Sequence, residues 1–431
     1  MRTAAFYTLG CKVSQYETEA IAEKFEQCGY KICNFSDFCD LYVINTCTVT
    51  AEADRKSRQI IRRAKRKNPD AKIIVCGCYS QRSPNEVSSL PDVNATIGSS
   101  GKMKIVDIAE RLFDGEDGIV EVTDINSEPF EPMKITRGPR TRVYVKIEDG
   151  CESKCTYCAI PSARGRVRSK PRLDVINEVE SLSQSGVAEI VLTGIETGSY
   201  GIDFEDRYRL ADLIAELDAR SSAARIRLGS LAPELIGKDF VDKVKNLKIL
   251  APHFHLSIQS GSDNVLRAMK RRYNRSMALE NISRLREFIP DATFTTDIMV
   301  GFPGESDADF EDTVRFVREA RFLDAHVFAY SKRKNTPAES YPNQIDEATK
   351  KKRSDTLMKI VRDVRIDVLS DIASSGKTLS CVFEEKRGQY WYGHSANFAE
   401  VMVESDSNLH GVQSDVIPLS LDGEIIIGKL I

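Results

Sequence analysis

Residues 150–158 read Gly-Cys-Glu-Ser-Lys-Cys-Thr-Tyr-Cys, so Cys151, Cys155 and Cys158 share one short loop. Thiolates are soft ligands that suit iron–sulfur clusters, zinc or copper. Three of them are one fewer than a four-iron cluster takes, which leaves one iron open to another ligand. A zinc site would need a fourth ligand close by, and no other Cys or His occurs between Cys158 and His253. The spacing therefore predicts a four-iron cluster with one open coordination position.

Alternating strands and helices surround this cysteine loop. The strand predicted at 142–147 delivers the loop from its carboxyl end, and five more strand–helix units follow. Six such units are three quarters of a (β/α) barrel, whose active face lies at the carboxyl ends of the strands. His253 and His255, beside the fourth strand, are expected to pack rather than to bind metal. The expected strands are 142–147, 188–193, 225–230, 254–259, 293–300 and 325–330, and the expected helices are 172–185, 208–219, 263–288 and 306–320.

The spacing of the three cysteines resembles the signature of the radical S-adenosylmethionine (SAM) enzymes. The resemblance implies that the open iron binds the amino and carboxylate groups of SAM. It also implies that an electron from the cluster splits the sulfonium to give a deoxyadenosyl radical. Residues at the strand ends would then form the SAM pocket, and a tyrosine within the loop would shield the cluster. The expected pocket residues are Tyr157, Thr193, Gly194, Ile195, Ser230, Gln259 and Asp297.

Size and composition suit an ordinary protein of two or three domains. The chain has 431 residues, of which 41% are hydrophobic and 29% are charged. A formal net charge of −3 does not indicate a polyanion partner, so any nucleic-acid contact has to come from local patches. No apolar run approaches the roughly 18 residues of a membrane helix, and the first residues lack a signal-peptide core. Eleven cysteines without an export signal favour a reducing cytoplasm and metal ligation over disulfides.

A second set of cysteines lies in the first 130 residues. Strands and helices alternate there, which indicates a parallel doubly wound sheet. Such sheets bind ligands outside the carboxyl ends of their strands. Cys11, Cys47 and Cys78 each follow a predicted strand, so they should meet at one sheet edge as three further thiolates. The strands concerned are 3–9, 41–45 and 72–76.

For any one of these cysteines, the alternative is a small buried hydrophobe. Cys76 competes with Cys78, but it lies within the strand and is expected to point into the core. The remaining cysteines have no partner at an informative spacing and are interpreted as structural. They are Cys28, Cys33, Cys39 and Cys381.

Two basic segments lie next to the proposed ligands. The helix predicted at 51–67 carries eight basic and two acidic side chains. Phosphate contact and an ordinary solvated surface both explain this excess. Basic residues near the cysteine loop and after the fourth barrel strand form either a rim around the barrel mouth or a solvated face. The rim candidates are Arg164, Arg166, Arg168, Arg267, Lys270, Arg271, Arg272 and Arg275.

The last part of the chain follows a polar helix predicted at 346–373. It alternates as short strands and predicts a small β-barrel of about five strands. Its aromatic side chains would suit stacking on RNA bases, yet residues 372–431 hold four basic and eight acidic side chains. The strands are expected at 379–383, 389–392, 398–403 and 424–428, with turns at Gly388, Gly393, Asn408 and Gly423. The aromatic candidates are Trp391, Tyr392, His394 and Phe398.

Residues 127–141 have the composition of a linker, with Pro129, Pro132, Gly138 and Pro139. The fold class is therefore α/β with a small all-β domain at the carboxyl end. The expected domains are residues 1–130, 138–365 and 366–431.

The whole chain resembles the methylthiotransferases. These enzymes combine an amino-terminal domain that has three cysteines, a radical SAM partial barrel and a carboxyl-terminal TRAM barrel. The resemblance is strongest to the bacterial branch that acts on threonylcarbamoyladenosine in tRNA, although Ser14 stands where the family often has Asn. The matching stretches are TLGCKVSQYETEA from Thr8, VINTCTVTAEADRKSRQIIRRA from Val43, CGCYSQ from Cys76, GCESKCTYCAIPSARGRVRS from Gly150, LTGIETGSYG from Leu192, HLSIQSGSDNVLRAMKRRY from His255, DIMVGFPGE from Asp297 and AYSKRKNTPA from Ala329.

This resemblance implies two four-iron clusters, hence about eight irons per chain, and two SAM molecules per turnover. Sulfur would be held and methylated by one SAM at Cys11, Cys47 and Cys78. A radical formed from the other SAM would remove hydrogen from carbon 2 of an adenine beside the tRNA anticodon, and that carbon would take the methylthio group. The base is already unpaired, so little unstacking cost is expected. The implied partners are tRNA, an electron donor such as flavodoxin or ferredoxin and an unidentified sulfur source, and the protein would act as a monomer.

Two sister branches methylthiolate isopentenyladenosine in tRNA or an aspartate of a ribosomal protein. The cysteines do not distinguish the branches, but the flanks CAIPSAR and CKVSQYE look like the threonylcarbamoyl branch. A non-catalytic iron–sulfur RNA-binding protein is the alternative from another class. Formation of deoxyadenosine from SAM under a reductant separates a catalyst from such a binding protein.

Overall fold

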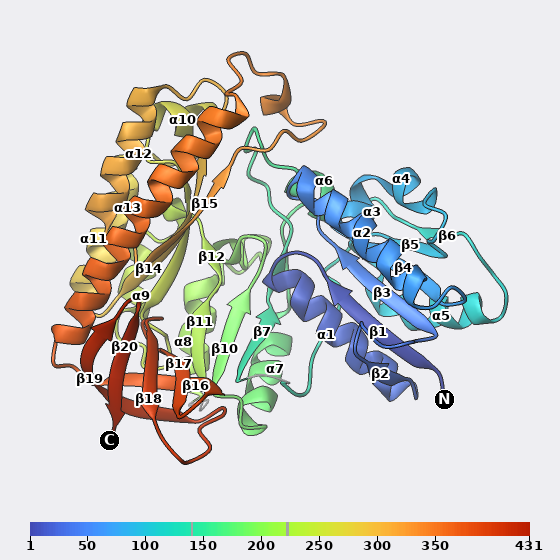
Figure 1. Cartoon of the computed structure of the whole chain (residues 1–431), viewed down its shortest axis with the longest axis horizontal. Coiled ribbons are helices and arrows are strands. Elements are labelled where there is room, and N and C mark those ends of the chain that lie inside the picture. Colours follow the sequence, from blue (N-terminus) through green and yellow to red (C-terminus); the bar gives the residue numbers. More distant parts are fainter. Residues whose placement is uncertain (139–140, 221–223) are drawn as a thin grey trace.

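The computed structural model describes residues 1–138, 141–220 and 224–431; Pro139 of the predicted linker lies outside them. The chain folds into three packed parts: an amino-terminal α/β part, a central partial barrel and a carboxyl-terminal β-barrel (Figure 1). Within the described ranges, no helix has the length and apolar character needed to cross a membrane.

The amino-terminal part is a six-stranded parallel sheet, which confirms the parallel sheet predicted there. Its strands are β1 Thr3–Thr8, β2 Lys31–Cys33, β3 Leu41–Thr46, β4 Lys72–Gly77, β5 Ala95–Ile97 and β6 Ile119–Glu121, and its helices are α1 Lys12–Gln27, α2 Ala51–Lys67, α3 Cys78–Arg82, α4 Pro84–Ser88 and α5 Ile105–Phe113. The strand order is β2-β1-β3-β4-β5-β6. Phe25 of α1 and Ile108 of α5 belong to the core on one face, whereas Ile61 of α2 belongs to the core on the other. Helices therefore cover both faces of the sheet.

Helix α2 has local reasons to form where it does. The side chain of Thr50 accepts a hydrogen bond from the backbone N–H of Ala53 at 3.1 Å and so caps the helix. Ser57, Ile61 and Ala64 are buried at helical spacing against the sheet. The basic side chains of the helix are consequently left on its solvent side.

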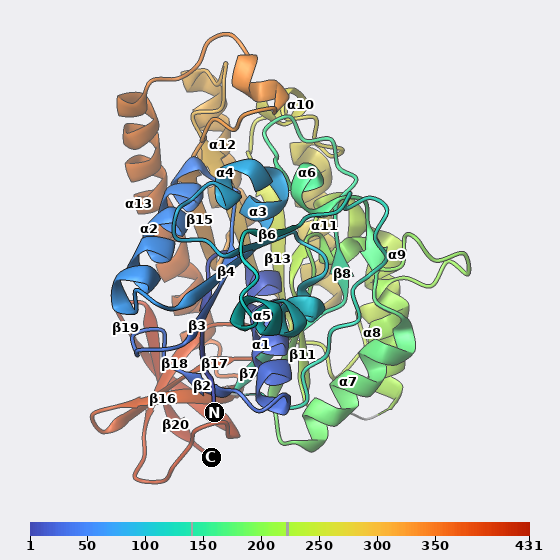
Figure 2. The ribbon, with the colours of Figure 1, turned by 90° about the vertical axis from the view of Figure 1, so that its right-hand side faces the viewer.

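The central part is a partial barrel of parallel strands, arranged as two adjoining sheets. Its strands are β7 Arg142–Lys146, β10 Glu189–Thr193, β11 Arg225–Leu228, β12 Ser230–Leu231, β13 His253–Gln259, β14 Thr293–Val300 and β15 Asp324–Ala329, and β8 Glu148–Asp149 pairs with β9 Arg168–Ser169 beside the cysteine loop. Its helices are α6 Ile160–Arg164, α7 Arg172–Gln184, α8 Leu210–Ala219, α9 Lys238–Val244, α10 Asp263–Ala268, α11 Arg275–Phe288, α12 Asp307–Ala320 and α13 Glu347–Ser374. The long α13 runs down one side of the barrel (Figure 2).

Two predicted elements of this part are wrong in detail. The strand expected at 225–230 is broken at Gly229 into β11 and β12, and these pieces belong to different sheets. The helix expected at 263–288 is also two helices, because Lys270 between them takes a left-handed backbone with φ +58°. Ser262 and Asn274 each accept a backbone hydrogen bond that caps the helix following them.

The carboxyl-terminal part is a closed five-stranded barrel in the order β16-β17-β18-β20-β19, as its pattern predicted. Its strands are β16 Leu379–Arg387, β17 Tyr390–Ser395, β18 Glu400–Glu404, β19 Gln413–Asp422 and β20 Ile425–Leu430. Strand β19 was not predicted from the sequence. Gly393 is not a turn but lies inside β17, where a Cβ atom would come within 2.2 Å of the carbonyl oxygen of Val382.

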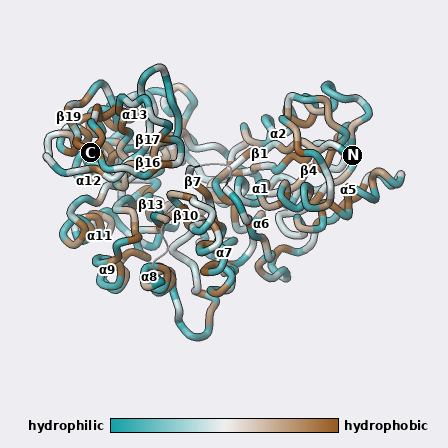
Figure 3. Tube along the Cα trace, turned by 90° about the horizontal axis from the view of Figure 1, so that it is seen from below, coloured by the Kyte–Doolittle hydropathy of each residue, from teal (hydrophilic) through white to brown (hydrophobic). Residues whose placement is uncertain are grey.

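This small barrel docks at the amino ends of the central strands (Figure 1), and Figure 3 shows the molecule from below, with the small barrel beside the central part. Arg225 and Arg227 of β11 pair with the buried Glu189 of β10 and also donate to carbonyl groups of the small barrel. The ring of Phe398 stacks between His253 and His394, with centroid distances of 4.5 and 4.8 Å. Phe398 thus belongs to the contact between the two barrels.

The packing argues against two of the proposed base-stacking side chains. Trp391 is 6% exposed and belongs to the core of the small barrel. Phe398 is sandwiched by the two histidine rings. Neither presents a free aromatic face to a nucleobase. Trp391 packs inside the small barrel, and Phe398 packs in the contact between the two barrels.

Candidate functional site

The cysteine loop lies between β8 and α6, beyond the carboxyl end of β7. Each of its sulfurs accepts one N–H hydrogen bond. The backbone N–H of Ser153 donates to Cys151 at 3.4 Å, that of Ile160 donates to Cys158 at 3.4 Å, and the guanidinium of Arg271 donates to Cys155 at 3.3 Å. Such donors favour the charged thiolate and tune the potential of a cluster that binds it.

These three cysteines open into a cavity of 230 Å³ at the carboxyl ends of the barrel strands. Four of the seven expected pocket residues line this cavity, and Thr193, Gly194 and Ser230 do not. Thr193 instead accepts the backbone N–H of Ile147 at 2.9 Å within the barrel wall. The four lining residues are Tyr157, Ile195, Gln259 and Asp297.

Two lining residues carry chemistry that the sequence pattern did not reveal. Glu196 is buried, and its carboxylate accepts the backbone N–H of Ala232 at 2.8 Å. Burial raises the pKa of Glu196 to about 7, so it is poised between charged and neutral near physiological pH. Arg271 was expected either on a rim around the barrel mouth or on a solvated face; it lines the cavity at the barrel mouth, where it faces Cys155. The roles of Glu196 and Arg271 could be identified only from the way the strand ends are arranged around the cavity.

Asp297 lies at the cavity wall beside His255, with 3.3 Å between Oδ2 and Nε2. Burial alone would raise the pKa of Asp297, but the hydrogen bond and charge of His255 lower it overall. His253 packs as expected, because it stacks on Phe398 and bonds to Thr295. His255 also bonds to Thr295.

The other set of cysteines lies at the edge of the amino-terminal sheet. Thr8 of β1 pairs with Asn45 of β3, and Thr46 pairs with Gly77 of β4, so the three strands end at the same level. Cys47 and Cys78 follow their strands directly, and Cys11 follows β1 after two residues. The parallel register therefore brings together residues that are far apart in sequence.

Contacts confirm that these three residues are neighbours. A Cβ atom on Gly10 would lie 3.3 Å from Cβ of Cys47. Burial and the nearby Cys78 and Cys11 raise the pKa of Cys47, the backbone N–H of Val49 lowers it, and the net result is a pKa of about 12. That N–H donates to Sγ of Cys47 at 3.5 Å.

Cys76 and Cys78 have different surroundings. Cys76 is fully buried in an apolar core, whereas Cys78 begins α3 and accepts a hydrogen bond from Arg164. Gly77 permits the sharp exit from β4, because its φ is +98° and a Cβ atom there would lie 2.5 Å from the Asn45 side chain. The other cysteines are dispersed: Cys28 is exposed, Cys33 is half-buried, Cys39 is buried, and Cys381 lies in the core of the small barrel.

The two sets of cysteines approach each other across the contact between the first two parts. Val49 and Thr50, just after Cys47, form part of the wall of the 230 Å³ cavity. Arg333, which follows β15, donates to Thr48 and to Asp54 at 2.7 Å each. The sulfurs of the first set are not themselves among the residues that line this cavity.

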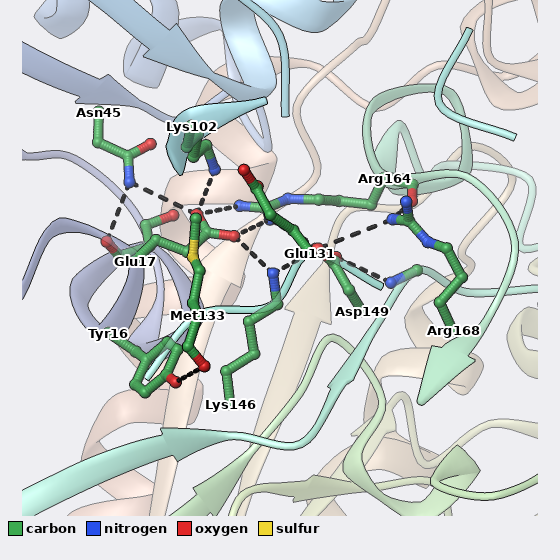
Figure 4. Close-up of polar contacts among 12 residues, drawn as sticks. Tyr16, Glu17, Asn45, Lys102, Glu131, Met133, Lys146, Asp149, Arg164 and Arg168 are labelled. Carbon is green, nitrogen blue, oxygen red and sulfur yellow. Dashed lines mark hydrogen bonds and ion pairs between the residues drawn. The ribbon is translucent and has the colours of Figure 1, made fainter. Parts of the chain in front are cut away.

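Arg164 and Arg168 do not form the predicted rim, because both are buried. Arg164 extends from the end of α6 into a group of charged side chains centred on Glu17 of α1 (Figure 4). Helix α1 packs against β7, which brings Glu17 beside Lys146 at 2.8 Å. These charges pair with one another in the interior and are withdrawn from solvent.

The two sets suit clusters better than single metal ions. Over the part of the chain that the structure describes, no three His, Cys, Asp or Glu side chains converge as ligands of one ion. A four-iron cluster differs because each of its thiolates binds a separate iron. Three thiols per set and N–H donors to sulfur fit such a cluster.

Helix α2 presents the most basic surface near the site. Arg62, Arg63 and Arg66 line a surface hollow along this helix. Arg55 pairs with Glu52, and Arg58 pairs with Glu86. No acidic ion-pair partner is found among the described residues for Arg62, Arg63, Arg66 and Lys67.

Two family models match the chain. The model described as "Radical SAM superfamily" covers residues 145–317, and the model described as "Uncharacterized protein family UPF0004" covers residues 3–98. The first includes the cysteine loop, and the second includes Cys11, Cys47 and Cys78.

Curated relatives match over almost the whole chain. The Threonylcarbamoyladenosine tRNA methylthiotransferase MtaB of Bacillus subtilis is 38% identical over 95% of this chain and 92% of its own length. The protein of the same name from Thermotoga maritima is 40% identical over 85% of this chain and 83% of its own. The tRNA-2-methylthio-N(6)-dimethylallyladenosine synthase of Pelotomaculum thermopropionicum is 32% identical over 98% of this chain and 96% of its own length.

Among solved structures, the radical S-adenosylmethionine methyltransferase TsrM from Kitasatospora setae superposes with a TM-score of 0.57. The match covers 78% of this chain and 77% of that one, at 15% sequence identity. At this identity the likeness concerns the fold alone.

Proposed function

The chain belongs to the radical SAM tRNA methylthiotransferases, and from this membership we propose that its substrate is threonylcarbamoyladenosine beside the tRNA anticodon. The enzyme would add a methylthio group to carbon 2 of that base with two SAM molecules and two four-iron clusters. The observation that carries this proposal is the 38% identity to a threonylcarbamoyladenosine methylthiotransferase over 95% of the chain. The relative that acts on dimethylallyladenosine is 32% identical.

We assign the cofactors to the two sets of cysteines. Cys151, Cys155 and Cys158 would hold the cluster that binds SAM, and Cys11, Cys47 and Cys78 would hold the auxiliary cluster. When bound, these groups supply radical formation and the sulfur that is transferred. The proposed SAM contacts are Tyr157, Thr193, Gly194, Ile195, Ser230, Gln259 and Asp297, and the proposed domains are 1–130, 138–365 and 366–431, the last being a TRAM barrel.

The protein itself has to hold the two clusters, SAM and the target base close together. The cavity is lined on one side by the cysteine loop and on the other by Val49 and Thr50 of the amino-terminal part. Arg333 ties this wall to the barrel through Thr48 and Asp54. These contacts support a reaction space to which both parts contribute walls.

The threonylcarbamoyladenosine assignment is tested by mass spectrometry of tRNA nucleosides. Cells that lack the gene are expected to lose the methylthio mark and to accumulate threonylcarbamoyladenosine, because the precursor is no longer consumed. Restoring the gene should restore the mark. Loss of the methylthio mark from isopentenyladenosine instead would assign the chain to the sister branch.

The purified enzyme gives a separate test of catalysis. After anaerobic reconstitution, the enzyme should form deoxyadenosine from SAM under a reductant such as reduced flavodoxin or ferredoxin. Absence of deoxyadenosine in a fully reconstituted sample would favour a non-catalytic RNA-binding protein. We propose that the enzyme works in the cytoplasm as a monomer.

We propose that α2 contacts the tRNA backbone. The helix follows its cap residue Thr50, which lies in the wall of the cavity, and extends away from it across the front of the amino-terminal sheet (Figure 1). Its exposed Arg62, Arg63 and Arg66 have no acidic ion-pair partner in the described structure. The small barrel, in contrast, carries twice as many acidic as basic side chains in residues 372–431. Phosphates are therefore better matched by α2.

Replacing Arg62 and Arg66 together with alanine is expected to weaken tRNA binding. The two residues lie one helical turn apart, and each phosphate contact contributes about one unit to the slope of log affinity against log salt. The slope should fall by about 2 in a titration by fluorescence anisotropy at several salt concentrations. Lys238→Ala, on an exposed part of α9, is the matched control and should leave the slope unchanged. An unchanged slope in the double variant would rule out α2 as the contact surface.

A further inference from the structure

Arg164 connects the two halves of the site in an unusual way. It belongs to the central barrel, six residues after Cys158, yet its Nε donates to Sγ of Cys78 in the amino-terminal part at 3.1 Å. Its side chain is completely buried. A buried guanidinium needs all of its N–H groups satisfied, so the partners of this side chain define its role.

The rest of the guanidinium is held by two carboxylates. NH1 donates to Glu17 at 2.5 Å and to Asp149 at 3.2 Å, and NH2 donates to Glu17 at 3.2 Å (Figure 4). Lys102 and Lys146 also pair with Glu17. The two carboxylates thus hold NH1 and NH2 of the guanidinium, and Nε points toward the sulfur of Cys78.

The buried group joins four cations to two carboxylates by direct ion pairs. Its cations are Lys102, Lys146, Arg164 and Arg168, and its carboxylates are Glu17 and Asp149. Two further carboxyl groups, those of Glu131 and the buried Glu148, border the same group. Buried charge requires a counter-charge. The sulfur of Cys78 accepts Nε of Arg164 and can therefore contribute part of that counter-charge as a thiolate.

We propose that Arg164 is a positioning residue that orients Cys78 and raises the reduction potential of the auxiliary cluster. This inference rests on the proposed assignment of Cys78 as a ligand of that cluster. A cluster gains negative charge when it is reduced, so a nearby cation and an N–H donor to its sulfur stabilise the reduced form. The arginine is supplied by the barrel, so the auxiliary potential depends on contact between the two parts.

The radical-forming set provides a matched arginine. Arg271 donates to Cys155 at 3.3 Å, as Arg164 does to Cys78. Each set of cysteines therefore has one sulfur that accepts a guanidinium hydrogen bond. A variant of Arg271 controls for general effects of removing an arginine near the site.

The test uses the full chain with Cys151, Cys155 and Cys158 all replaced by alanine, which leaves the auxiliary set alone. After reconstitution, iron content is measured and the cluster is titrated electrochemically with detection by EPR. Arg164→Gln is expected to lower the potential, so that the ratio of reduced to oxidised cluster at a fixed potential falls at least tenfold. That change corresponds to 59 mV for a one-electron couple. Arg271→Gln in the same background should leave the potential unchanged.

Each result decides a separate question. A full complement of iron with an unshifted potential in Arg164→Gln overturns the role of Arg164 and leaves the proposed function intact. Absence of a cluster in the Cys151, Cys155 and Cys158 background overturns the auxiliary site, and the inference falls with it. If Arg164→Gln does not fold, Arg164→Met decides, because methionine is also a long unbranched side chain but removes both the charge and the N–H donors that serve Glu17 and Cys78. An unshifted potential in that folded variant also overturns the inference.

Discussion

Cys78→Ala is expected to reduce methylthiolation of tRNA to background while SAM cleavage persists. Cys78 lies beside Cys47 at the edge of the amino-terminal sheet and is not among the residues lining the cavity of the radical-forming set. Its loss should therefore disable the sulfur-donating half of the reaction alone. Arg164 keeps Glu17 and Asp149 as partners in the variant, so the fold should be retained. Product nucleosides and deoxyadenosine are measured in the same reaction by liquid chromatography.

Cys76→Ala is the matched control, two residues away on the same segment. Cys76 packs in the apolar core, so its replacement should cost stability and leave the reaction in place. If Cys76→Ala loses methylthiolation and Cys78→Ala retains it, Cys76 is the cluster ligand and Cys78 is the structural residue. Loss of SAM cleavage in Cys78→Ala would mean that the two sets of cysteines do not act separately.

Glu17→Gln is expected to destabilise the protein by about 3–5 kcal/mol, because it removes one partner of a buried ionic group. Glu17 is completely buried and accepts from Lys102, Lys146 and Arg164. Glutamine has nearly the same shape but leaves these cations with too little negative charge. The measurement is the shift of the chemical unfolding transition of the full chain, compared with Glu26→Gln.

Glu26 is on the same helix, and its exposed side chain pairs with Arg137. Replacing it should change stability by less than about 1 kcal/mol, as is usual for exposed ion pairs. Equal effects of the two variants would show that the group around Glu17 does not stabilise the contact between the first two parts.

The effect of Glu17 also has a defined pH dependence. Burial alone would raise the pKa of Glu17, but Arg164, Lys102 and Lys146 hold it well below its ordinary value of 4.5. A carboxylate with a depressed pKa stabilises the folded state fully above its unfolded pKa, and this contribution is lost as the pH falls through the folded pKa. The difference in stability between the wild type and Glu17→Gln should therefore be constant near neutral pH and should narrow below about pH 4.5.

Much of the fold could be predicted because the relevant signals are local. Alternation of apolar strands and amphipathic helices indicated the parallel sheet and the barrel. The errors occurred where tertiary contacts override local preference. Gly393, a plausible turn residue, lies in a strand because the crossing strand leaves no room for a side chain. Residues 263–288 contain one long run of helix-forming residues, yet the chain breaks at Lys270 to enclose the barrel.

The sequence by itself was enough to identify the two sets of three cysteines. Their residue type, their spacing and their position after a strand are local properties, which do not depend on how distant segments pack. The sequence also indicated that Cys78 rather than Cys76 leaves the sheet edge, because a glycine stands between them. Only the tertiary structure decided the roles of the charged residues. Arg164 and Arg271 look like surface cations along the chain, but the packing of α1 against β7 buries the first among carboxylates and the cavity wall aims the second at Cys155. Whether a cation meets water, a carboxylate or a sulfur depends on which distant segments pack together, and that information is not present in any short stretch of sequence.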